Sequence, residues 1–232
     1  LQPQTLLAER PELNINLRGK RVALICKDRF LRALARDALR LAGHEVSSDA
    51  EITFSLTESQ ARVLPRERML TEEEQWLLCA RALSLHGGAV YDTQDYGLPE
   101  LLPCDEGADC RLQRRILGDG VARLLLLMTL FDRETVEQAV TALPALTRRT
   151  ADIPCDMRDK GRVLSALRER GTLREQGGIL SQDARGRTVI RPDAALPLIH
   201  VAACARDAEN AQELCDLFSA DIKRLLQNSF EG

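Results

Sequence analysis

Hydrophobic residues in the first half of the chain alternate between runs typical of buried strands and spacings typical of helices. Residues 21–26 predict a strand, and Asp28 can cap a helix that ends at Gly43. A second strand begins at residue 44, so these elements predict a β-α-β unit with a parallel sheet and a right-handed crossover. A capped helix over 72–85 and a short strand over 89–91 are expected to follow.

The second half of the chain predicts a different arrangement. Residues 92–115 are rich in turn formers and are expected to be irregular, and Gly118-Asp119-Gly120 then leads into a helix over 121–131. Residues 152–227 have the pattern β-α-β-β-β-α, which is typical of a four-stranded sheet with two helices on one face. The predicted fold class is therefore α/β followed by α+β.

These elements predict three regions. We expect a linker or N-terminal extension over 1–17, a truncated α/β domain with a merged sheet over 18–150, and a C-terminal α+β domain over 151–232. Because the chain opens with Leu1 and not Met, we also expect it to be part of a longer polypeptide.

Composition narrows the classes of function. The 232 residues have a net charge of -3, a pI near 5.8 and 3% aromatic residues, so no nucleic-acid partner is expected. The longest apolar run, 124–130, is too short for a membrane helix, so no membrane partner is expected either. The seven cysteines are scattered along the chain, which favours a reducing compartment over a disulfide framework and a cytoplasmic location.

A proline-marked loop lies between two β-branched runs near the C-terminus. It reads Arg191-Pro192-Asp193-Ala194-Ala195-Leu196-Pro197-Leu198-Ile199-His200-Val201. This sequence resembles the phosphate-binding loop of the α-D-phosphohexomutase family (phosphomannomutase, phosphoglucomutase and phosphoglucosamine mutase), where the pattern is Arg-Pro-Ser-Gly-Thr-Glu-Pro-x-x-Arg-Val. The resemblance implies a loop in which hydroxyls, inward-facing N–H groups and arginines hold a phosphate.

Most of the polar positions of that loop are changed here. Among them only Arg191 keeps its residue type, whereas Asp193 stands at the serine position and His200 at the second arginine. A carboxylate about 4 Å from a phosphate charge costs on the order of 4 kcal/mol at an effective dielectric constant near 20. We therefore interpret Arg191, Asp193 and His200 as a vestigial phosphate loop.

A second resemblance follows the strand that ends at Phe54. Phosphohexomutases carry an Asp-Gly-Asp-x-Asp-Arg loop there, and its three carboxylates hold Mg²⁺; the matching positions in this chain are Ser55, Thr57 and Ser59. Three neutral hydroxyls cannot replace three carboxylates around Mg²⁺. We therefore predict no metal site and no cofactor, with Mg²⁺ expected only if this alignment is wrong. The segment from Cys104 to Cys110 has a spacing that fits no usual zinc site.

The resemblance extends over about 118–227 and, less closely, over 18–92. It implies a truncated, degenerate member of the family, with a shortened three-layer α/β domain followed by the family's last α+β domain. The family's sugar-binding loop and its first domain, which holds the phosphoserine nucleophile, have no counterpart in this sequence. Phosphoryl transfer requires the nucleophile, the metal and the phosphate clamp together, so we predict no catalytic residue and favour a chain that is not an enzyme by itself.

Three functions remain as hypotheses. The first is a non-catalytic, structural or regulatory module of a sugar-phosphate or sugar-nucleotide pathway protein, joined to an upstream domain or partner enzyme such as one resembling mannose-1-phosphate guanylyltransferase. The second is a sugar-phosphate-binding protein or phosphomannomutase-like enzyme with a remodelled site, in which Asp119 joins Arg191, Asp193 and His200. The third is an interaction module that forms a homo-oligomer through a sheet edge or the helix at 121–131. The sequence does not specify a particular hexose phosphate.

Overall fold

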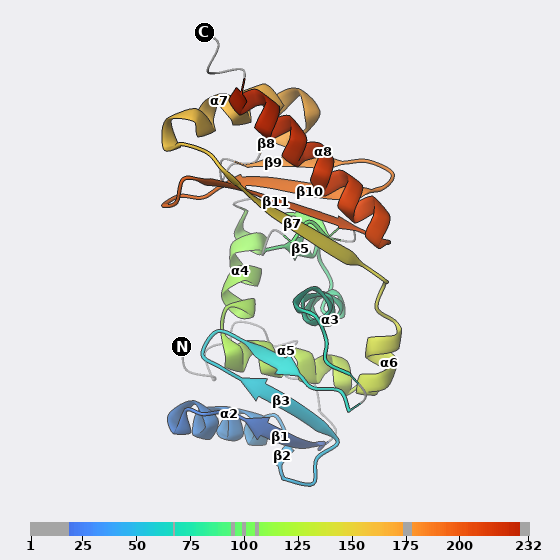
Figure 1. Cartoon of the computed structure of the whole chain (residues 1–232). Helices are drawn as coiled ribbons and strands as arrows, with labels where there is room; N and C mark the ends of the chain where they lie inside the picture. The colour runs from blue at the N-terminus through green and yellow to red at the C-terminus, as the bar shows by residue number, and fades with distance from the viewer. Residues whose placement is uncertain are drawn as a thin grey trace. The chain divides into compact units, whose positions relative to one another are not determined.

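A computed structural model describes residues 19–66, 68–93, 96–98, 101–104, 107–173 and 178–227, with the elements shown in Figure 1. The described residues form two units. The first consists of the described parts of Leu1–Val90 and Ala108–Leu143, and the second of those of Tyr91–Gly107 and Pro144–Gly232. The predicted linker over 1–17 lies outside the described residues.

The first unit contains a four-stranded sheet in the order β2-β1-β3-β4. Strand β1 (Arg21–Ile25) is parallel to β2 (Glu45–Val46) and to β3 (Ile52–Leu56), and β4 (Ala61–Val63) is antiparallel to β3. Helix α2 (Arg29–Leu41) connects β1 to β2 and is capped by Asp28, whose carboxylate accepts a hydrogen bond from Leu31 N at 2.8 Å. The predicted β-α-β unit and its parallel pairing are confirmed.

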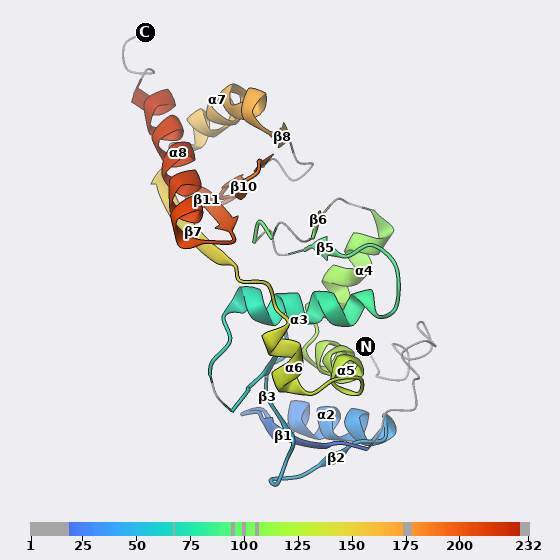
Figure 2. The ribbon, with the colours of Figure 1, turned by 90° about the vertical axis from the view of Figure 1, so that its right-hand side faces the viewer.

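Described helices cover one face of this sheet. Side chains alternate along β3, because Ile52, Phe54 and Leu56 are buried whereas Thr53 and Ser55 are only partly buried. Helix α5 (Gly120–Phe131) packs on β3, β4 and α2, and α3 (Glu72–Ser84) packs on α5 (Figure 2). The described residues therefore form layers in the order sheet, helix, helix. The sequence analysis expected a shortened three-layer α/β domain without specifying the order of the layers; β3 has its fully buried side chains on one side only.

Helix α5 is the centre of the first unit. All of its residues are buried, and Asp119 caps it by accepting hydrogen bonds from Val121 N and Ala122 N, both at 2.9 Å. The helix is therefore not available as the dimerisation surface that was one sequence hypothesis.

No helix in the described part of the chain combines the length and the apolar character that a membrane span requires. Helix α6 (Val136–Thr141), capped by Thr135, follows α5 in the first unit.

The segment expected to be irregular contains further structure. Helix α4 (Ala108–Leu117) begins within it and ends two residues beyond it, and β5 (Tyr91–Asp92) pairs with β6 (Leu102–Pro103) in a two-stranded sheet of its own. The sequence analysis expected a merged sheet, but these strands do not join the first sheet. Two-residue strands carry no hydrophobic period that could have shown their partner in advance.

The cysteines differ in their oxidation state. Cys104 and Cys110 are disulfide-bonded, so the expectation of thiols throughout the chain does not hold for these two. The free cysteines of the described residues are all buried: Cys26, Cys79, Cys155, Cys204 and Cys215.

The second unit contains an antiparallel five-stranded sheet in the order β7-β11-β10-β9-β8. Its strands are β7 (Thr147–Pro154), β8 (Thr172–Leu173), β9 (Ile179–Gln182), β10 (Gly186–Pro192) and β11 (Leu198–Ala205). The sequence analysis predicted four strands. The additional strand, β8, is an edge strand of two residues, which is too short to show an alternating pattern.

Two helices cover one face of the five-stranded sheet, as predicted (Figure 1). Helix α7 (Met157–Leu167) is followed by a 3-10 turn (Arg168–Arg170), and α8 (Ala208–Gln227) closes the described chain. The hydrophobic core between sheet and helices includes Ile153, Val163, Ile199, Val201, Leu214 and Phe218.

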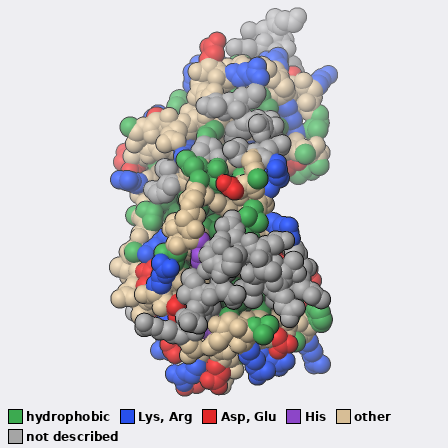
Figure 3. Space-filling model, turned by 180° about the vertical axis from the view of Figure 1, so that it is seen from behind, with side chains coloured by type: hydrophobic (Ala, Val, Ile, Leu, Met, Phe, Trp, Pro, Cys, Tyr) green, Lys and Arg blue, Asp and Glu red, His purple; other side chains and the backbone are tan. Residues whose placement is uncertain are grey.

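The opposite face of this sheet, called here the open face, is partly covered by the segment Tyr91–Gly107. Arg187 of β10 anchors the segment: its guanidinium is buried and donates to Leu98 O at 2.6 Å and to Leu101 O at 2.7 Å. Asp92 stabilises a turn in this segment, because its carboxylate accepts hydrogen bonds from Gly97 N at 2.7 Å and from Leu98 N at 3.0 Å. On the face shown in Figure 3, described side chains of both charges are interspersed, in keeping with the small net charge of -3.

Gly120 is a position where a side chain cannot fit. A Cβ atom there would lie 2.0 Å from Thr57 O and 3.0 Å from Gln60 O, so we expect Gly120→Ala to lower the free energy of unfolding by about 1–3 kcal/mol. Gly161, inside α7, has nothing within 4 Å of the same added atom, and Gly161→Ala should raise stability by about 0.5–1 kcal/mol. Urea unfolding of both variants checks the pair, and equal effects of the two substitutions would contradict it.

Arg187 should hold the Tyr91–Gly107 segment against the sheet. Arg187→Met leaves the carbonyls of Leu98 and Leu101 without this donor, at roughly 1–3 kcal/mol for each buried group. We expect faster amide hydrogen exchange at residues 96–98 and a lower urea midpoint. The matched control is Arg185→Met at the exposed β9–β10 turn, which should change stability by less than about 0.5 kcal/mol.

Candidate functional site

The loop at residues 193–197 connects β10 to β11. Arg191 pairs with His200 and Pro192 with Ile199, and Asp193 N donates to Leu198 O at 3.0 Å. The carboxylate of Asp193 turns back over the loop, and its Oδ1 accepts from Ala195 N at 2.8 Å and Leu196 N at 2.7 Å. Backbone N–H groups that point into a turn are a typical site for an anion. In this loop the anion is the protein's own side chain.

Lys160 of α7 holds the same loop through its backbone. The lysine is buried, and its Nζ donates to Asp193 O at 2.6 Å and to Leu196 O at 2.5 Å. The path of the loop is therefore supported independently of the Asp193 carboxylate. The sequence analysis missed Lys160, and no sequence signal could have found it, because its partners are backbone carbonyls 33 and 36 residues further along the chain.

His200 lies between two carboxylates. Its Nε2 is 2.9 Å from Asp193 Oδ2, and its Nδ1 is 2.7 Å from Asp152 Oδ1 on β7, the residue that faces it across the β11–β7 pairing. The hydrogen bonds with Asp152 and then Asp193 raise the pKa of His200. The pKa of Asp193 is held well below its usual range by the hydrogen bond with His200 and by those from Leu196 N and Ala195 N. Both ring nitrogens can donate together only in the protonated imidazolium, which this arrangement favours.

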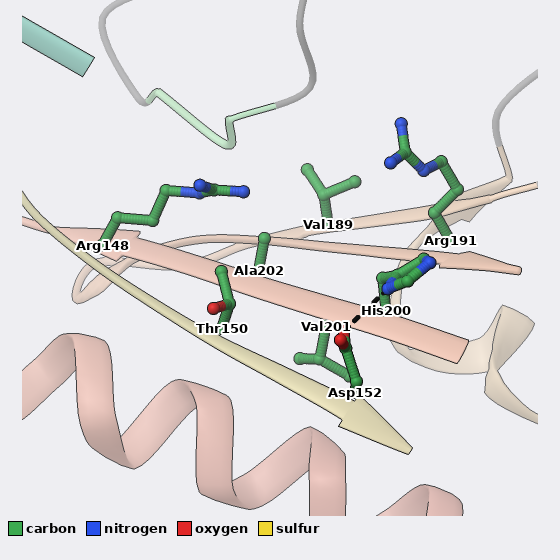
Figure 4. Close-up of a pocket in the computed structure, with 8 residues that line it drawn as sticks. All are labelled: Arg148, Thr150, Asp152, Val189, Arg191, His200, Val201 and Ala202. Carbon is green, nitrogen blue, oxygen red and sulfur yellow. Dashed lines mark hydrogen bonds and ion pairs between the residues drawn. The ribbon is translucent and has the colours of Figure 1, made fainter. Parts of the chain in front are cut away.

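A hollow of about 250 Å³ opens on the open face beside this cluster. It is lined from three neighbouring strands by Arg148, Thr150, Asp152, Val189, Arg191, His200, Val201 and Ala202 (Figure 4). Arg148 at its far end lies over the ring of Tyr96, 4.9 Å from the ring centroid. The guanidinium of Arg191 is exposed and makes no hydrogen bond or ion pair with any other described residue.

The predicted site residues thus have different roles. Asp193 and His200 contact each other, and Arg191 lines the same hollow without bonding to either. Asp119, the fourth candidate, uses its carboxylate to cap α5 in the first unit. Asp152, Thr150 and Arg148 were missed. Alternation along β7 places them on one face, but their register against β11 is set by pairing across 48 residues of chain, which the sequence pattern does not show.

The turn that resembles a metal loop does not offer the donors that Mg²⁺ requires. Ser55 lies in β3, while Thr57 and Ser59 are exposed neutral hydroxyls in the turn between β3 and β4. Two carbonyls of the turn are already engaged, since Glu58 O accepts from Gly120 N and Gln60 O from Thr57 N, both at 2.8 Å. Within the described ranges, no three or more His, Cys, Asp or Glu side chains group together in a way that could hold a metal ion. The residues present do not fit the magnesium site of a phosphohexomutase.

Comparison with known proteins bears on the fold. No protein-family model matches the sequence, and no curated protein matches it at a significant level. Among solved structures, the chain is similar to a phosphoglucomutase/phosphomannomutase family protein from Burkholderia thailandensis, with a TM-score of 0.64 and 14% sequence identity over 97% of this chain and 65% of that one. It is also similar to N-acetylphosphoglucosamine mutase from Aspergillus fumigatus, solved with GlcNAc-6P and magnesium, with a TM-score of 0.52 and 10% identity over 96% of this chain.

The chain spans 65% of the length of each of these two solved proteins. At this level of identity the likeness concerns the fold and not the chemistry. The chain therefore shares the fold of these two mutases over the part of their length that it covers.

Proposed function

We propose that this chain is a degenerate phosphohexomutase-like module that does not catalyse phosphoryl transfer. The observation that carries the proposal is the position of the Asp193 carboxylate. It accepts the hydrogen bonds of Ala195 N and Leu196 N and lies 2.9 Å from His200 Nε2. A phosphate that entered the loop would have to displace this carboxylate, or approach it and bear the repulsion between like charges.

The turn between β3 and β4 supports the same proposal. Glu58 is the one carboxylate in this turn, Thr57 and Ser59 are neutral, and two of its carbonyls accept backbone hydrogen bonds. Phosphoryl transfer needs metal ions or cationic groups to stabilise the charge on the transferred group, together with an activated nucleophile. No serine in the sequence lies in a motif like that of the family's phosphoserine. A module that no longer catalyses phosphoryl transfer would be expected to lose the phosphate clamp, the metal site and the nucleophile together.

We propose a structural or regulatory role in sugar-phosphate or sugar-nucleotide metabolism, alongside an upstream domain or partner enzyme. The support is the fold, since the solved proteins that it resembles are mutases of sugar phosphates by their printed names. A partner resembling mannose-1-phosphate guanylyltransferase would fit such a pathway. Cytoplasmic location and freedom from Mg²⁺ are parts of the same proposal.

One observation favours a second candidate, a binding protein with a remodelled site. Arg191, an exposed guanidinium, lines a hollow together with His200 and Asp152. A cation beside a concave surface is a feature of small-molecule sites. This candidate is compatible with the absence of catalysis and concerns the sheet face and not the loop.

The proposal predicts how Asp193 affects phosphate binding. We expect the wild-type chain to show no mutase turnover with glucose 1-phosphate or mannose 1-phosphate in the presence of Mg²⁺ and a hexose bisphosphate, and no thermal shift with inorganic phosphate. In Asp193→Ser the two loop N–H groups become available while Lys160 still holds the loop. We expect this variant to gain a Tm shift of a few degrees in phosphate at about 100 times Kd, which corresponds to about 2.7 kcal/mol.

The matched control for that prediction is Asp183→Ser. Asp183 also accepts two backbone hydrogen bonds in a turn, from Arg185 N at 2.8 Å and Gly186 N at 3.3 Å, but it has no histidine partner among the described residues. It should gain no phosphate response. Mutase turnover by the wild-type chain, or a phosphate response in the wild type as large as in Asp193→Ser, would overturn the proposal.

Because the pKa of His200 is raised, the interaction between His200 and Asp193 should depend on pH. Because the folded state raises this pKa, the stabilisation is complete below the unfolded value near 6.5 and is lost as the pH rises through the folded value. We expect an imidazole NMR titration to give His200 a pKa above 6.5 and Asp152→Asn to lower it, since Asp152 is the larger cause. The effect on stability should be small, because these groups are partly exposed and screened by solvent. A wild-type pKa at or below 6.5 would contradict this account.

A further inference from the structure

Strand β7 lies at the edge of the five-stranded sheet. It pairs with β11 on one side and with no other described strand, and it is eight residues long. Its residues Arg149, Thr150 and Asp152 are exposed. A long edge strand offers a row of backbone N–H and C=O groups to a further strand. The outer edge of β7 is therefore a candidate interaction surface.

The direction of these backbone groups follows from one hydrogen bond at the end of the strand. Cys155 N donates to Pro197 O at 2.8 Å, and this pair continues the register of β7 against β11. In an antiparallel pair, alternate residues direct both their N–H and their C=O groups toward the partner strand. The odd-numbered residues of β7 therefore bond to β11. The backbone groups of Arg148, Thr150 and Asp152 face the outer edge.

The three residues that face the outer edge carry a self-complementary pattern of charges. Their side chains, from Arg148 through Thr150 to Asp152, follow one another along β7 on the open face (Figure 4). An antiparallel second copy of β7 centred on Thr150 places Arg148 of each strand opposite Asp152 of the other. Opposite charges at directly opposed positions stabilise a pair of strands, whereas like charges destabilise it.

Other registers of the same edge satisfy fewer groups. A shift by two residues places Arg148 opposite Pro154, which has no N–H to donate, and a shift in the other direction places it opposite Thr150. Neither shift brings the arginine to the aspartate. In the register centred on Thr150, all three outward-facing residues exchange both of their backbone hydrogen bonds.

We propose that the outer edge of β7 pairs with β7 of a second copy of this chain, forming a dimer with a two-fold axis at Thr150. The axis is perpendicular to the sheet, so the sheets of the two copies join with their open faces on the same side. Asp152 keeps His200 in this arrangement, because His200 Nδ1 binds its Oδ1 and its Oδ2 makes no hydrogen bond with a described residue. A contact along one strand edge is small, so we expect a reversible dimer that forms at micromolar or higher concentrations.

Sedimentation velocity of the full chain over micromolar to millimolar concentrations tests the proposal, and we expect a reversible equilibrium between monomer and dimer. Arg148→Asp and Asp152→Arg each place like charges at both opposed positions, so each variant should associate with itself about tenfold more weakly or less. An equimolar mixture of the two variants has complementary edges again and should form a heterodimer with a Kd within about threefold of the wild type. A wild-type chain that stays monomeric, or two variants that do not associate when mixed, would overturn the proposal.

The matched control is Arg149→Asp, which makes the same change of charge one residue away. Arg149 lies on the other face of β7 and opposite Ala151 in the proposed pair, so the Kd should change by less than about threefold. Thr150→Pro removes the central outward N–H, spares the bonds to β11 and should abolish the dimer. Thermal melting followed by circular dichroism shows which variants fold, and the charge variants decide if Thr150→Pro does not. Equal weakening by Arg148→Asp and Arg149→Asp would sink the proposed pairing.

Discussion

The hydrogen bonds of the Asp193 carboxylate determine the character of this molecule's candidate site. One oxygen of that group accepts two backbone N–H groups of its own loop, and the other lies against His200. Lys160 binds the carbonyls on the other side of the same loop, so that donors and acceptors of the loop backbone are both satisfied from within the protein. The loop connects two antiparallel strands. Because its backbone N–H and C=O groups are engaged in this way, few remain that could bind a phosphate.

The five-stranded sheet explains how these groups meet. Pairing of β10, β11 and β7 places Arg191, His200 and Asp152 in one row and Val189, Ala202 and Thr150 in the next. The helices bury the opposite face, where Ile199 and Val201 of β11 enter the core. Because side chains alternate along each strand, the same pairing that builds the core also gathers the polar groups on the open face. The same strand register therefore determines both the hydrophobic core and the arrangement of the site residues.

The first unit also contains a turn whose backbone is engaged by packing against a helix. The N-terminus of α5 lies so close to the turn between β3 and β4 that only glycine fits at residue 120, and Gly120 N donates to Glu58 O. The turn therefore serves as a support for the buried helix. Its serine and threonine hydroxyls are exposed and neutral, and its support of the helix depends on backbone groups and not on these side chains.

Local patterns in the sequence were enough to predict the β-α-β start, the capped helices and the strand-loop-strand around residues 191–201, because capping residues and hydrophobic periods act over a few neighbouring positions. The resemblance to the phosphohexomutase loop identified Asp193 and His200 as altered positions, although not their contact. Only the tertiary structure brought Asp152 to His200 and Lys160 to the loop, and added β8 to the sheet. Those contacts join residues far apart in the chain through strand register and helix packing, and neither leaves a periodic signal at the residues it brings together.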